Sequence, residues 1–379
     1  MVLLLLDLSA AFDTVNHSIL LERLNKLYGV SDTSLDWFRS YLTGRDATVT
    51  IGELRSVPTE LTIGVPQGSI LGPILFICYT KELELIAEKH GVEIHFYADD
   101  TQVYAAYSSE NFADIEEKLQ ACVSDIQSWL TVNFLQLNPN KTEVLILSPR
   151  ESDSTNSIHL FKDGEPTDVT GAARNLGVYF DSKLSMDEHV LKVVNACKAT
   201  LVNLWRIAGK LSRRLRTLLV CSLIHSKMDY CNSLMTGMTK KNVLELQKVQ
   251  NAAARFIFGQ RRWQGTTRLR KELHFLPVAE RIEFKTCVLV YKCLNGLAPD
   301  YLSGRVQRRK QKLSIRLRID EDTLILVEPS TTFETTKRAF SISGPKLWNK
   351  LPRKLRESKT LKQFKVDLKT FLFRRAFGV

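Results

Sequence analysis

Apolar residues fall in short, strand-like runs along the first half of the chain. Val2–Leu6 is apolar throughout and stops at Asp7, which is the pattern of a buried strand rather than of a signal peptide. From Val92 to Tyr107, apolar residues alternate up to an aspartate pair near the bend, and Val103–Tyr107 then return. This segment is the clearest hairpin, and a further strand is predicted over Lys141–Leu147.

Helical spacing of apolar residues separates these strands. One amphipathic helix begins at His17 and is stopped by Gly29, and a second spans about Ser34–Leu42. An apolar helix follows Ser69, and another covers Asn111–Asn133. Between the second and third helices the pattern predicts a hairpin that leads into a glycine-containing loop.

After residue 185 the pattern becomes helical. One apolar face recurs at spacings of four and three and consists of Val190, Val194, Cys197, Leu201, Leu204, Ala208 and Leu211. Two further helices are predicted over 213–230 and 240–258, and the chain past 260 is basic and broken, including the run 305–312. Strands with helices followed by helices alone predict an α+β protein.

The size and composition of the chain narrow its class. A length of 379 residues exceeds one ordinary core, so two or three domains are expected. With 44% hydrophobic and 25% charged residues the chain is typical of a soluble globular protein, and no run approaches the roughly 18 apolar residues of a membrane span. The seven cysteines are scattered without a CxxC motif, which favours reduced thiols in an intracellular chain over zinc ribbons or disulfides.

Charge is divided unevenly along the chain. Residues 1–190 carry 13 Lys and Arg against 28 Asp and Glu, whereas residues 191–379 carry 40 against 13. A half this basic is typical of a protein that binds a polyanion, most often nucleic acid. A basic surface that serves only solubility is the alternative, although such surfaces normally mix both signs.

The aspartate pair Asp99 and Asp100 is the first candidate for chemistry. Hard divalent cations bind oxygens of one or two carboxylates and leave other positions to water and phosphate. A strand that ends in Asp7, beside the hairpin that ends in Asp99, would bring carboxylates to one sheet edge, where two metal ions could support in-line phosphoryl transfer. The alternative is a turn in which the aspartates accept backbone hydrogen bonds.

Five segments occur in a fixed order: LLLLDLSAAFDTVNH, GVPQGSILGP, FYADD, LQLNPNKTEVL and NLGVYFDSKLS. Together they resemble the successive palm motifs of reverse transcriptases, most closely those of non-LTR (LINE-type) retrotransposons, including Jockey-like clades. The later strings DYCNSL, GPKLWNKLP and LKQFKVDLKTFL resemble the carboxyl-terminal region of such elements, so the resemblance covers nearly the whole chain. It implies an RNA-directed DNA polymerase.

The resemblance implies a two-metal site. Asp7, Asp99 and Asp100 match the metal-binding acids of the family, and Lys141 resembles a lysine proposed to protonate the pyrophosphate leaving group. The implied cofactors are two Mg²⁺ ions, with Mn²⁺ as a substitute. A solvated lysine near a strand start is the alternative for Lys141, and Asp13 is expected to have a structural or capping role.

The resemblance also implies a deoxynucleotide site. Phe12 matches the residue that stacks under the incoming sugar and excludes a ribose 2′-hydroxyl, with a plain core phenylalanine as the alternative. The loop residues that match contacts to the templating pair and the nucleotide are Gly64, Pro66, Gln67 and Gly68. Glycines allow close approach of the backbone and a glutamine amide offers donor and acceptor, although loop punctuation alone would also explain the glycines.

The implied architecture is a polymerase right hand with its fingers largely missing. Residues 1–180 would form the palm, an antiparallel sheet with helices on one face, followed by an all-helical thumb at 181–260 and a basic mixed region at 261–379. The implied partners are an RNA template, a DNA primer and dNTPs, and no membrane. Phosphate contacts from the helical half are expected of Arg206, Arg213, Arg214 and Arg216.

The amino-terminal boundary bears on activity. The family carries fingers before the first palm motif, whereas this chain begins six residues before Asp7, so we expect a truncated chain whose fold and metal site are retained and whose activity is weak or absent. A non-catalytic nucleic-acid-binding remnant that uses the basic half is the alternative, and a maturase or telomerase-like relative is a third possibility. An intracellular location, in a nuclear or cytoplasmic ribonucleoprotein, is expected.

Overall fold

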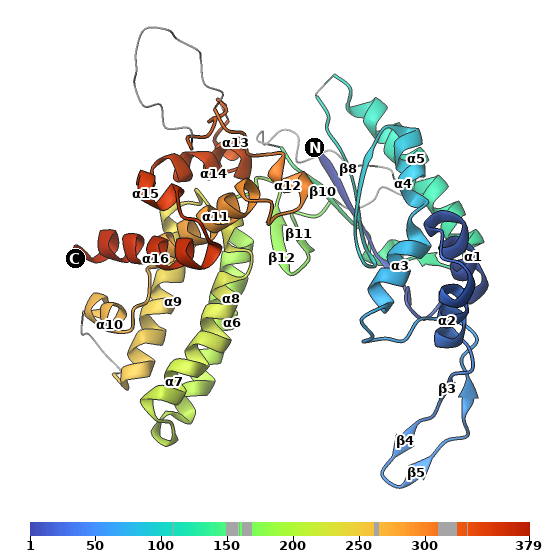
Figure 1. The fold of residues 1–379 in the computed structure, drawn as a ribbon, viewed down its shortest axis with the longest axis horizontal. Helices are drawn as coiled ribbons and strands as arrows, with labels where there is room; N and C mark the ends of the chain where they lie inside the picture. Colours follow the sequence, from blue (N-terminus) through green and yellow to red (C-terminus); the bar gives the residue numbers. More distant parts are fainter. Residues whose placement is uncertain are drawn as a thin grey trace. The chain divides into compact units, whose positions relative to one another are not determined.

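The computed structural model describes residues 1–108, 110–148, 158, 160, 169–260, 265–309, 324–331 and 333–379 (Figure 1). Residue contacts divide the chain between Gly177 and Val178 into two units, and each unit has an apolar core of its own. The domain boundaries at 180 and 260 remain predictions. No helix in the described ranges is both long and apolar enough to cross a membrane.

The first unit is built on a four-stranded antiparallel sheet. Its strands lie in the order β10 (Glu143–Ile146), β1 (Val2–Leu6), β8 (Asp100–Ala105) and β7 (Glu93–Tyr97). The strand at Val2–Leu6 and the hairpin are confirmed. The returning strand begins at Asp100 rather than at Val103, because Thr101 already pairs with Leu6 and its side chain is buried.

Helices cover one face of this sheet (Figure 1). Leu4, at the centre of β1, lies between Val103 of β8 and Val144 of β10, and all three side chains are fully buried. Each such side chain contributes about 1.5–3 kcal/mol of transfer free energy.

The helices of this unit are α1 (His17–Tyr28), α2 (Asp32–Leu42), α3 (Gly72–Thr80), α4 (Leu83–His90) and α5 (Phe112–Val132).

Capping residues set the ends of these helices. Asn16 precedes α1, and its Oδ1 accepts hydrogen bonds from two backbone N–H groups of the first turn. Gly29 ends α1 in the left-handed conformation, at φ 67°, as the sequence predicts. The helix predicted from Ser69 begins only at Gly72, because the Ser69 hydroxyl accepts a hydrogen bond from the Gly72 N–H ahead of the first turn.

Between α2 and α3 the chain forms an extended two-stranded arm (Figure 1). Its pairs are β3 (Asp46–Ala47) with β6 (Thr59–Glu60), and β4 (Thr50–Ile51) with β5 (Leu54–Arg55). A separate short pair joins β2 (Leu8–Ser9) to β9 (Gln136–Leu137). The hairpin predicted ahead of the glycine-containing loop is therefore confirmed.

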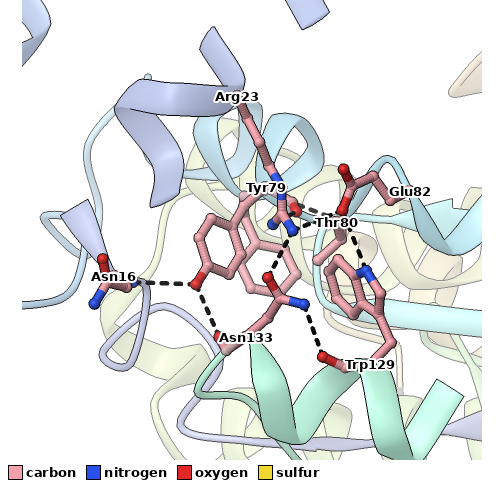
Figure 2. Close-up of polar contacts among 8 residues, drawn as sticks. Asn16, Arg23, Tyr79, Thr80, Glu82, Trp129 and Asn133 are labelled. Carbon is pink, nitrogen blue, oxygen red and sulfur yellow. Dashed lines mark hydrogen bonds and ion pairs between the residues drawn. The ribbon is translucent and has the colours of Figure 1, made fainter. Parts of the chain in front are cut away.

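The buried cation Arg23 joins three helices of the first unit (Figure 2). It donates hydrogen bonds to the carbonyl oxygen of Tyr79, to Glu82 Oε2 at 2.7 Å and to Asn133 Oδ1 at 2.6 Å. Its guanidinium also lies 4.8 Å from the ring centre of Tyr79 and 4.9 Å from that of Trp129. Because the charge is paired with Glu82 and the guanidinium donates three hydrogen bonds, this network fixes how α1 lies against α3 and the end of α5.

The second unit is almost entirely helical. It begins with β12 (Val178–Asp181), which follows β11 (Ala172–Asn175) of the first unit along the chain. Its helices are α6 (Asp187–Arg206), α7 (Arg213–Val220), α8 (Ser226–Asp229), α9 (Lys240–Phe258), α10 (Thr266–Glu272), α11 (Val278–Leu294), α12 (Asp300–Ser303), α13 (Glu334–Lys337), α14 (Phe340–Asn349), α15 (Arg353–Arg356) and α16 (Leu361–Phe377). A π-helical turn, Cys221–His225, joins α7 to α8, so the helix predicted at 213–230 is confirmed with one irregular turn.

The apolar face predicted over residues 190–211 divides between two elements. Its first five members lie on α6, which ends at Arg206, and the last two belong to a 3-10 turn over Ala208–Lys210 and the residue after it. Gly209 in this turn is a poor helix residue, which explains the earlier end of α6. The predicted helix at 240–258 is confirmed as α9, which packs along α6.

The prediction of a broken region past residue 260 is wrong for the described residues. α11 and α16 are each 17 residues long, and they share an apolar core in which Tyr291 stacks on Phe364 at 4.5 Å between ring centres. The many lysines and arginines of this region lie mainly on exposed faces, and they conceal the apolar spacing in the sequence. The basic run 305–312 is described only as far as Arg309.

Candidate active site

The register of the central strands brings two predicted acids to the same sheet edge. β1 and β8 pair antiparallel as far as Leu6 opposite Thr101. Asp7 and Asp100 are the next residues along the two strands, and both line the same cavity. Side chains at neighbouring positions on paired antiparallel strands lie close together, so strand pairing brings together two carboxylates that are far apart in sequence.

The hairpin turn between β7 and β8 places the third acid. Tyr97 pairs with Asp100, which leaves Ala98 and Asp99 as a two-residue loop. Ala98 has φ 56°, a left-handed conformation that an alanine adopts only at a cost. Asp99 is half-buried in this turn, whereas Asp100 is exposed at the start of β8.

Asp7, Asp100 and Lys141 line one cavity of about 90 Å³. Lys141 Nζ lies 3.5 Å from Asp7 Oδ2, an ion-pair distance, and Asp7 Oδ2 is buried and accepts no hydrogen bond from the described residues. Burial raises the pKa of the Asp100 carboxyl, and the charges of Asp99 and Asp7 raise it further. The cavity lining therefore has one more carboxylate than it has cations, since Asp7, Asp100 and Glu143 face Lys141 and Arg174.

The donor set of this cavity fits a divalent cation in part. Among the described residues, no three His, Cys, Asp or Glu side chains lie close enough together to hold a metal ion, so the three predicted acids do not form one cluster. Asp7 and Asp100 nevertheless supply two carboxylates, and Asp7 Oδ2 has an ion pair with Lys141 but accepts no hydrogen bond from the described residues. Mg²⁺ is commonly bound through one or two carboxylates together with water and substrate phosphates.

The predicted nucleotide loop packs against the turn that follows β1. The backbone N–H of Gly64 donates to the carbonyl oxygen of Val15 at 2.8 Å, and the N–H of Val65 donates to that of Phe12 at 2.8 Å. Gly64 has φ 83°, and a Cβ at this position would lie 2.8 Å from the carbonyl oxygen of Asp13. Only glycine allows this close approach, so Gly64 has a backbone role here.

Polar contacts complete this junction. Gln67 Nε2 lies 2.9 Å from both carboxylate oxygens of Asp13, which confirms a structural role for Asp13. His17 Nε2 lies 2.8 Å from the carbonyl oxygen of Gly64 and is buried at the start of α1. Phe12 is half-buried, with its ring centre 5.1 Å from that of Phe76. Phe12 therefore packs against the apolar core of the first unit and remains partly exposed.

The cavity has further polar residues that pattern reasoning missed. Its lining includes Gln102, Glu143, Arg174 and Asn175 in addition to the predicted acids and lysine. Gln102 Nε2 donates to Asn175 Oδ1 at 3.1 Å, and the backbone N–H of Arg174 donates to Glu143 Oε2 at 3.3 Å. The sequence did carry one signal for Gln102. Buried and more exposed residues alternate along β8, so Gln102 lies on the strand face opposite the buried Val103. Pro66, Gly68 and Asp99 are not among the lining residues.

The four arginines predicted to contact phosphates fall into two pairs. Arg213 donates to Glu272 at 2.7 Å, and Arg216 donates to a backbone carbonyl oxygen at 2.7 Å, so both stabilise the fold around α7. Arg206 and Arg214 are exposed and have no hydrogen-bond or ion-pair partner in the part of the chain that the structure describes. Only this second pair is fully available to a phosphate.

Sequence comparison relates the chain to known proteins. Residues 1–180 match the family model for Reverse transcriptase (RNA-dependent DNA polymerase). In Drosophila melanogaster, the probable RNA-directed DNA polymerase from transposon BS is 27% identical over 294 residues, which are 74% of this chain and 31% of that protein. The RNA-directed DNA polymerase from mobile element jockey is 23% identical over 286 residues, which are 73% of this chain and 30% of that protein.

Residues 1–180 therefore belong to the reverse transcriptase family, the class of RNA-directed DNA polymerases. The relatives place this domain with the non-LTR, LINE-type retrotransposons, as the motif resemblance predicts. The chain spans about a third of the length of these relatives. Among solved structures, a telomerase chain from Candida albicans in complex with a fragment of telomeric RNA is similar to this chain. The alignment has a TM-score of 0.34 and 15% identity, and it covers 75% of this chain and 48% of the telomerase chain. This similarity is too weak to carry an argument.

Proposed function

We propose that this chain carries the catalytic palm of a polymerase that copies RNA by adding deoxynucleotides to a primer 3′-hydroxyl. The observation that supports this best is the pairing of β1 with β8, whose next residues Asp7 and Asp100 line one cavity, together with the buried Asp7 oxygen that accepts no hydrogen bond. Two carboxylates at the ends of adjacent central strands suit a hard divalent cation.

Asp7 and Asp100 would hold Mg²⁺ or Mn²⁺, with Asp99 as the third acid from the turn. When bound, these ions lower the pKa of the primer hydroxyl and offset the charge of the triphosphate. The chain itself supplies the negative potential of the cavity, since burial and neighbouring carboxylates already raise the Asp100 pKa. A cation beside Asp100 would favour the charged form of its carboxyl.

The residues around the acids would position the substrate. The ring of Phe12 packs against that of Phe76, with 5.1 Å between ring centres, and it would form one side of a deoxyribose pocket. Gln67 is held by Asp13 at the adjoining loop and would contact the nucleotide or the templating base. The Lys141 side chain is 68% exposed and would reach the departing pyrophosphate to donate a proton.

The template and primer would be held through their phosphates. Arg206 and Arg214 in the second unit are exposed cations that the protein itself does not pair among its described residues. Contacts of this kind bind an RNA/DNA duplex without reading its bases and weaken as salt rises.

Metal binding tests the proposed site without any need for turnover. Mn²⁺ titrated into the purified chain and followed by electron paramagnetic resonance should give a site that Asp7→Asn and Asp100→Asn each weaken at least tenfold. Asp114→Asn, at an exposed position in the first turn of α5, is the matched control and should leave Mn²⁺ affinity unchanged. Equal affinity in all four proteins would refute the site.

Nucleic-acid binding without catalysis is the second candidate, and the basic second half of the chain favours it. Under this function, replacing both Asp99 and Asp100 by Asn leaves every activity of the chain unaltered. Under the polymerase function the same double substitution abolishes nucleotide incorporation and leaves RNA binding in place. Measuring incorporation and RNA binding on the same pair of proteins separates the two.

A further inference from the structure

A lysine-rimmed cavity lies in the second unit, between α11, α16 and the turn after α8. Its volume is about 330 Å³, at the lower end of the range for small-molecule sites. Lys285 and Lys292 of α11 and Lys365 of α16 line it, and within the described ranges none of the three ammonium groups has a hydrogen-bond or ion-pair partner. Three unpaired like charges around one opening favour an anion there.

The acids near this cavity are already engaged elsewhere. Asp229 on the cavity wall forms a bidentate pair with Arg281, with Nε 2.9 Å from Oδ1. Glu283 of α11 is bound by Arg375 at 2.9 Å, and Asp367 of α16 accepts a hydrogen bond from a glutamine one turn earlier. α11 and α16 together carry eight basic and three acidic residues, so the potential at the cavity is positive.

The cavity also has an apolar wall and a buried asparagine in its lining. Phe284, Val288 and Leu289 line it alongside the lysines. Asn232 lines it as well, is only 2% exposed, and has an Oδ1 atom that accepts no hydrogen bond from the described residues. Its Nδ2 donates to Asp229 Oδ1 at 3.2 Å, which fixes the orientation of the amide. A buried acceptor without a partner is costly unless a ligand donates to it.

We propose that this cavity binds one phosphate-bearing nucleotide unit. The phosphate would lie among the three lysines, the base would lie against the apolar wall, and an N–H or O–H of the nucleotide would donate to Asn232 Oδ1. A solvated lysine face would account for the charges but for neither the cavity nor the buried acceptor. The unit can come from a nucleic-acid strand or from a free nucleotide, and this inference does not depend on the proposed polymerase site.

Binding of a fluorescein-labelled 12-nucleotide oligouridylate, measured by fluorescence anisotropy in EDTA, tests this site apart from metal-dependent chemistry. The variant K285Q/K292Q/K365Q removes the three cavity lysines. Its matched control, K240Q/K350Q/K354Q, removes the same charge from exposed lysines that do not line the cavity. Circular dichroism establishes that both variants are folded.

The cavity variant should lose at least tenfold in affinity at 0.15 M salt. Its plot of log affinity against log salt should flatten by about 0.7, because the variant loses one phosphate contact to a single strand. The control should lose less than threefold. Equal losses in the two variants would overturn the proposal, because delocalised charge would then explain the binding.

Two further measurements address the acceptor and the source of the nucleotide. Asn232→Ala leaves the lysines in place and should weaken oligouridylate binding at least threefold, whereas unchanged affinity in a folded variant would overturn the role of its Oδ1. Unlabelled UTP that displaces the oligomer from the wild-type chain indicates a free nucleotide as the ligand. Lysine-dependent oligomer binding that UTP does not displace indicates a strand, and the absence of lysine-dependent binding for both probes would refute the site.

Discussion

Asp7 is close to one cation and is proposed to bind another. Lys141 Nζ lies 3.5 Å from Asp7 Oδ2, and the lysine side chain is 68% exposed, so water and salt screen the pair. When no metal ion is present, the lysine charge is the nearest compensation for this carboxylate. A divalent ion bound by Asp7 and Asp100 would compete with the lysine for the same oxygen.

Lys141→Gln should therefore tighten Mn²⁺ binding by up to about fivefold, which is the range that an exposed ion pair contributes. Titration followed by electron paramagnetic resonance measures this change, and Lys118→Gln, at an exposed position on α5, is the control. Weaker Mn²⁺ binding in Lys141→Gln would contradict the competition and would mean that the lysine orients Asp7 for the metal.

His225 makes the stability of the second unit sensitive to pH. It is 4% exposed in the π-helical turn, and burial, followed by the charge of Arg281, lowers its pKa to about 4. A histidine in the unfolded chain titrates near 6.5, so the unfolded state binds more protons between pH 6.5 and 4. Stability is therefore highest above pH 6.5 and falls, by up to about 3 kcal/mol, as the pH drops through this window.

Urea denaturation between pH 7.5 and 4 should show this loss in the wild-type chain and a shallower loss in His225→Gln, which cannot take up the proton. His95→Gln, at an exposed position on β7, is the control and should follow the wild type. An unchanged slope in His225→Gln would rule out His225 as the source of the pH dependence.

The turn after β1 and the loop before α3 depend on one glycine. Gly64 has φ 83°, and its backbone approaches Asp13 so closely that a Cβ would lie 2.8 Å from the carbonyl oxygen. Gly68, in the same loop, has φ 75° but has no atom within 4 Å of a Cβ. The two glycines therefore separate the cost of a left-handed backbone from the cost of a steric clash.

Gly64→Ala should destabilise the first unit by about 2–4 kcal/mol, because strain and clash add, whereas Gly68→Ala should cost about 1–2 kcal/mol. Urea denaturation followed by circular dichroism measures both. Equal costs would show that the loop moves away from Asp13 without penalty and that this packing does not hold the candidate nucleotide loop in place.

The local spacing of apolar residues predicted individual helices and strands better than it predicted the contacts between them. The apolar run of β1 and the alternation of β7 are local signals, and both strands were found from them. The Arg23 network was missed because a basic residue on an apolar helix face carries no sign of partners 56 to 110 residues away. α11 and α16 were missed because dense charge concealed their apolar spacing.

Hydrophobic periodicity alone did not predict the candidate active site, and the ordered sequence motifs were needed as well. Asp7, Asp99, Asp100 and Lys141 came from ordered motifs, and the pairing of β1 with β8 brings Asp7 and Asp100 to one cavity. The approach of Lys141 to Asp7 depends on backbone geometry that no local spacing encodes. The same holds for the lysine-rimmed cavity, whose residues come from three separate elements.

The molecule as a whole combines a domain of the reverse transcriptase family with a basic helical unit. The acidic first half holds the candidate metal ligands, and the second half carries the cations suited to nucleic-acid phosphates. Under the proposed function, the opposite charges of the two parts would suit two tasks, which are to bind cations at the reacting atoms and to bind the backbone of the template and primer.

Primer extension on poly(rA)/oligo(dT), with dTTP and either Mg²⁺ or Mn²⁺, tests the polymerase function most directly. The wild-type chain should incorporate dTTP at a low rate, and Asp99→Asn and Asp100→Asn should each reduce incorporation at least a hundredfold or to background. Asp114→Asn should match the wild type. Incorporation that persists in both aspartate variants, or that is no higher in the wild type than in them, would contradict the assignment of these acids as the catalytic site.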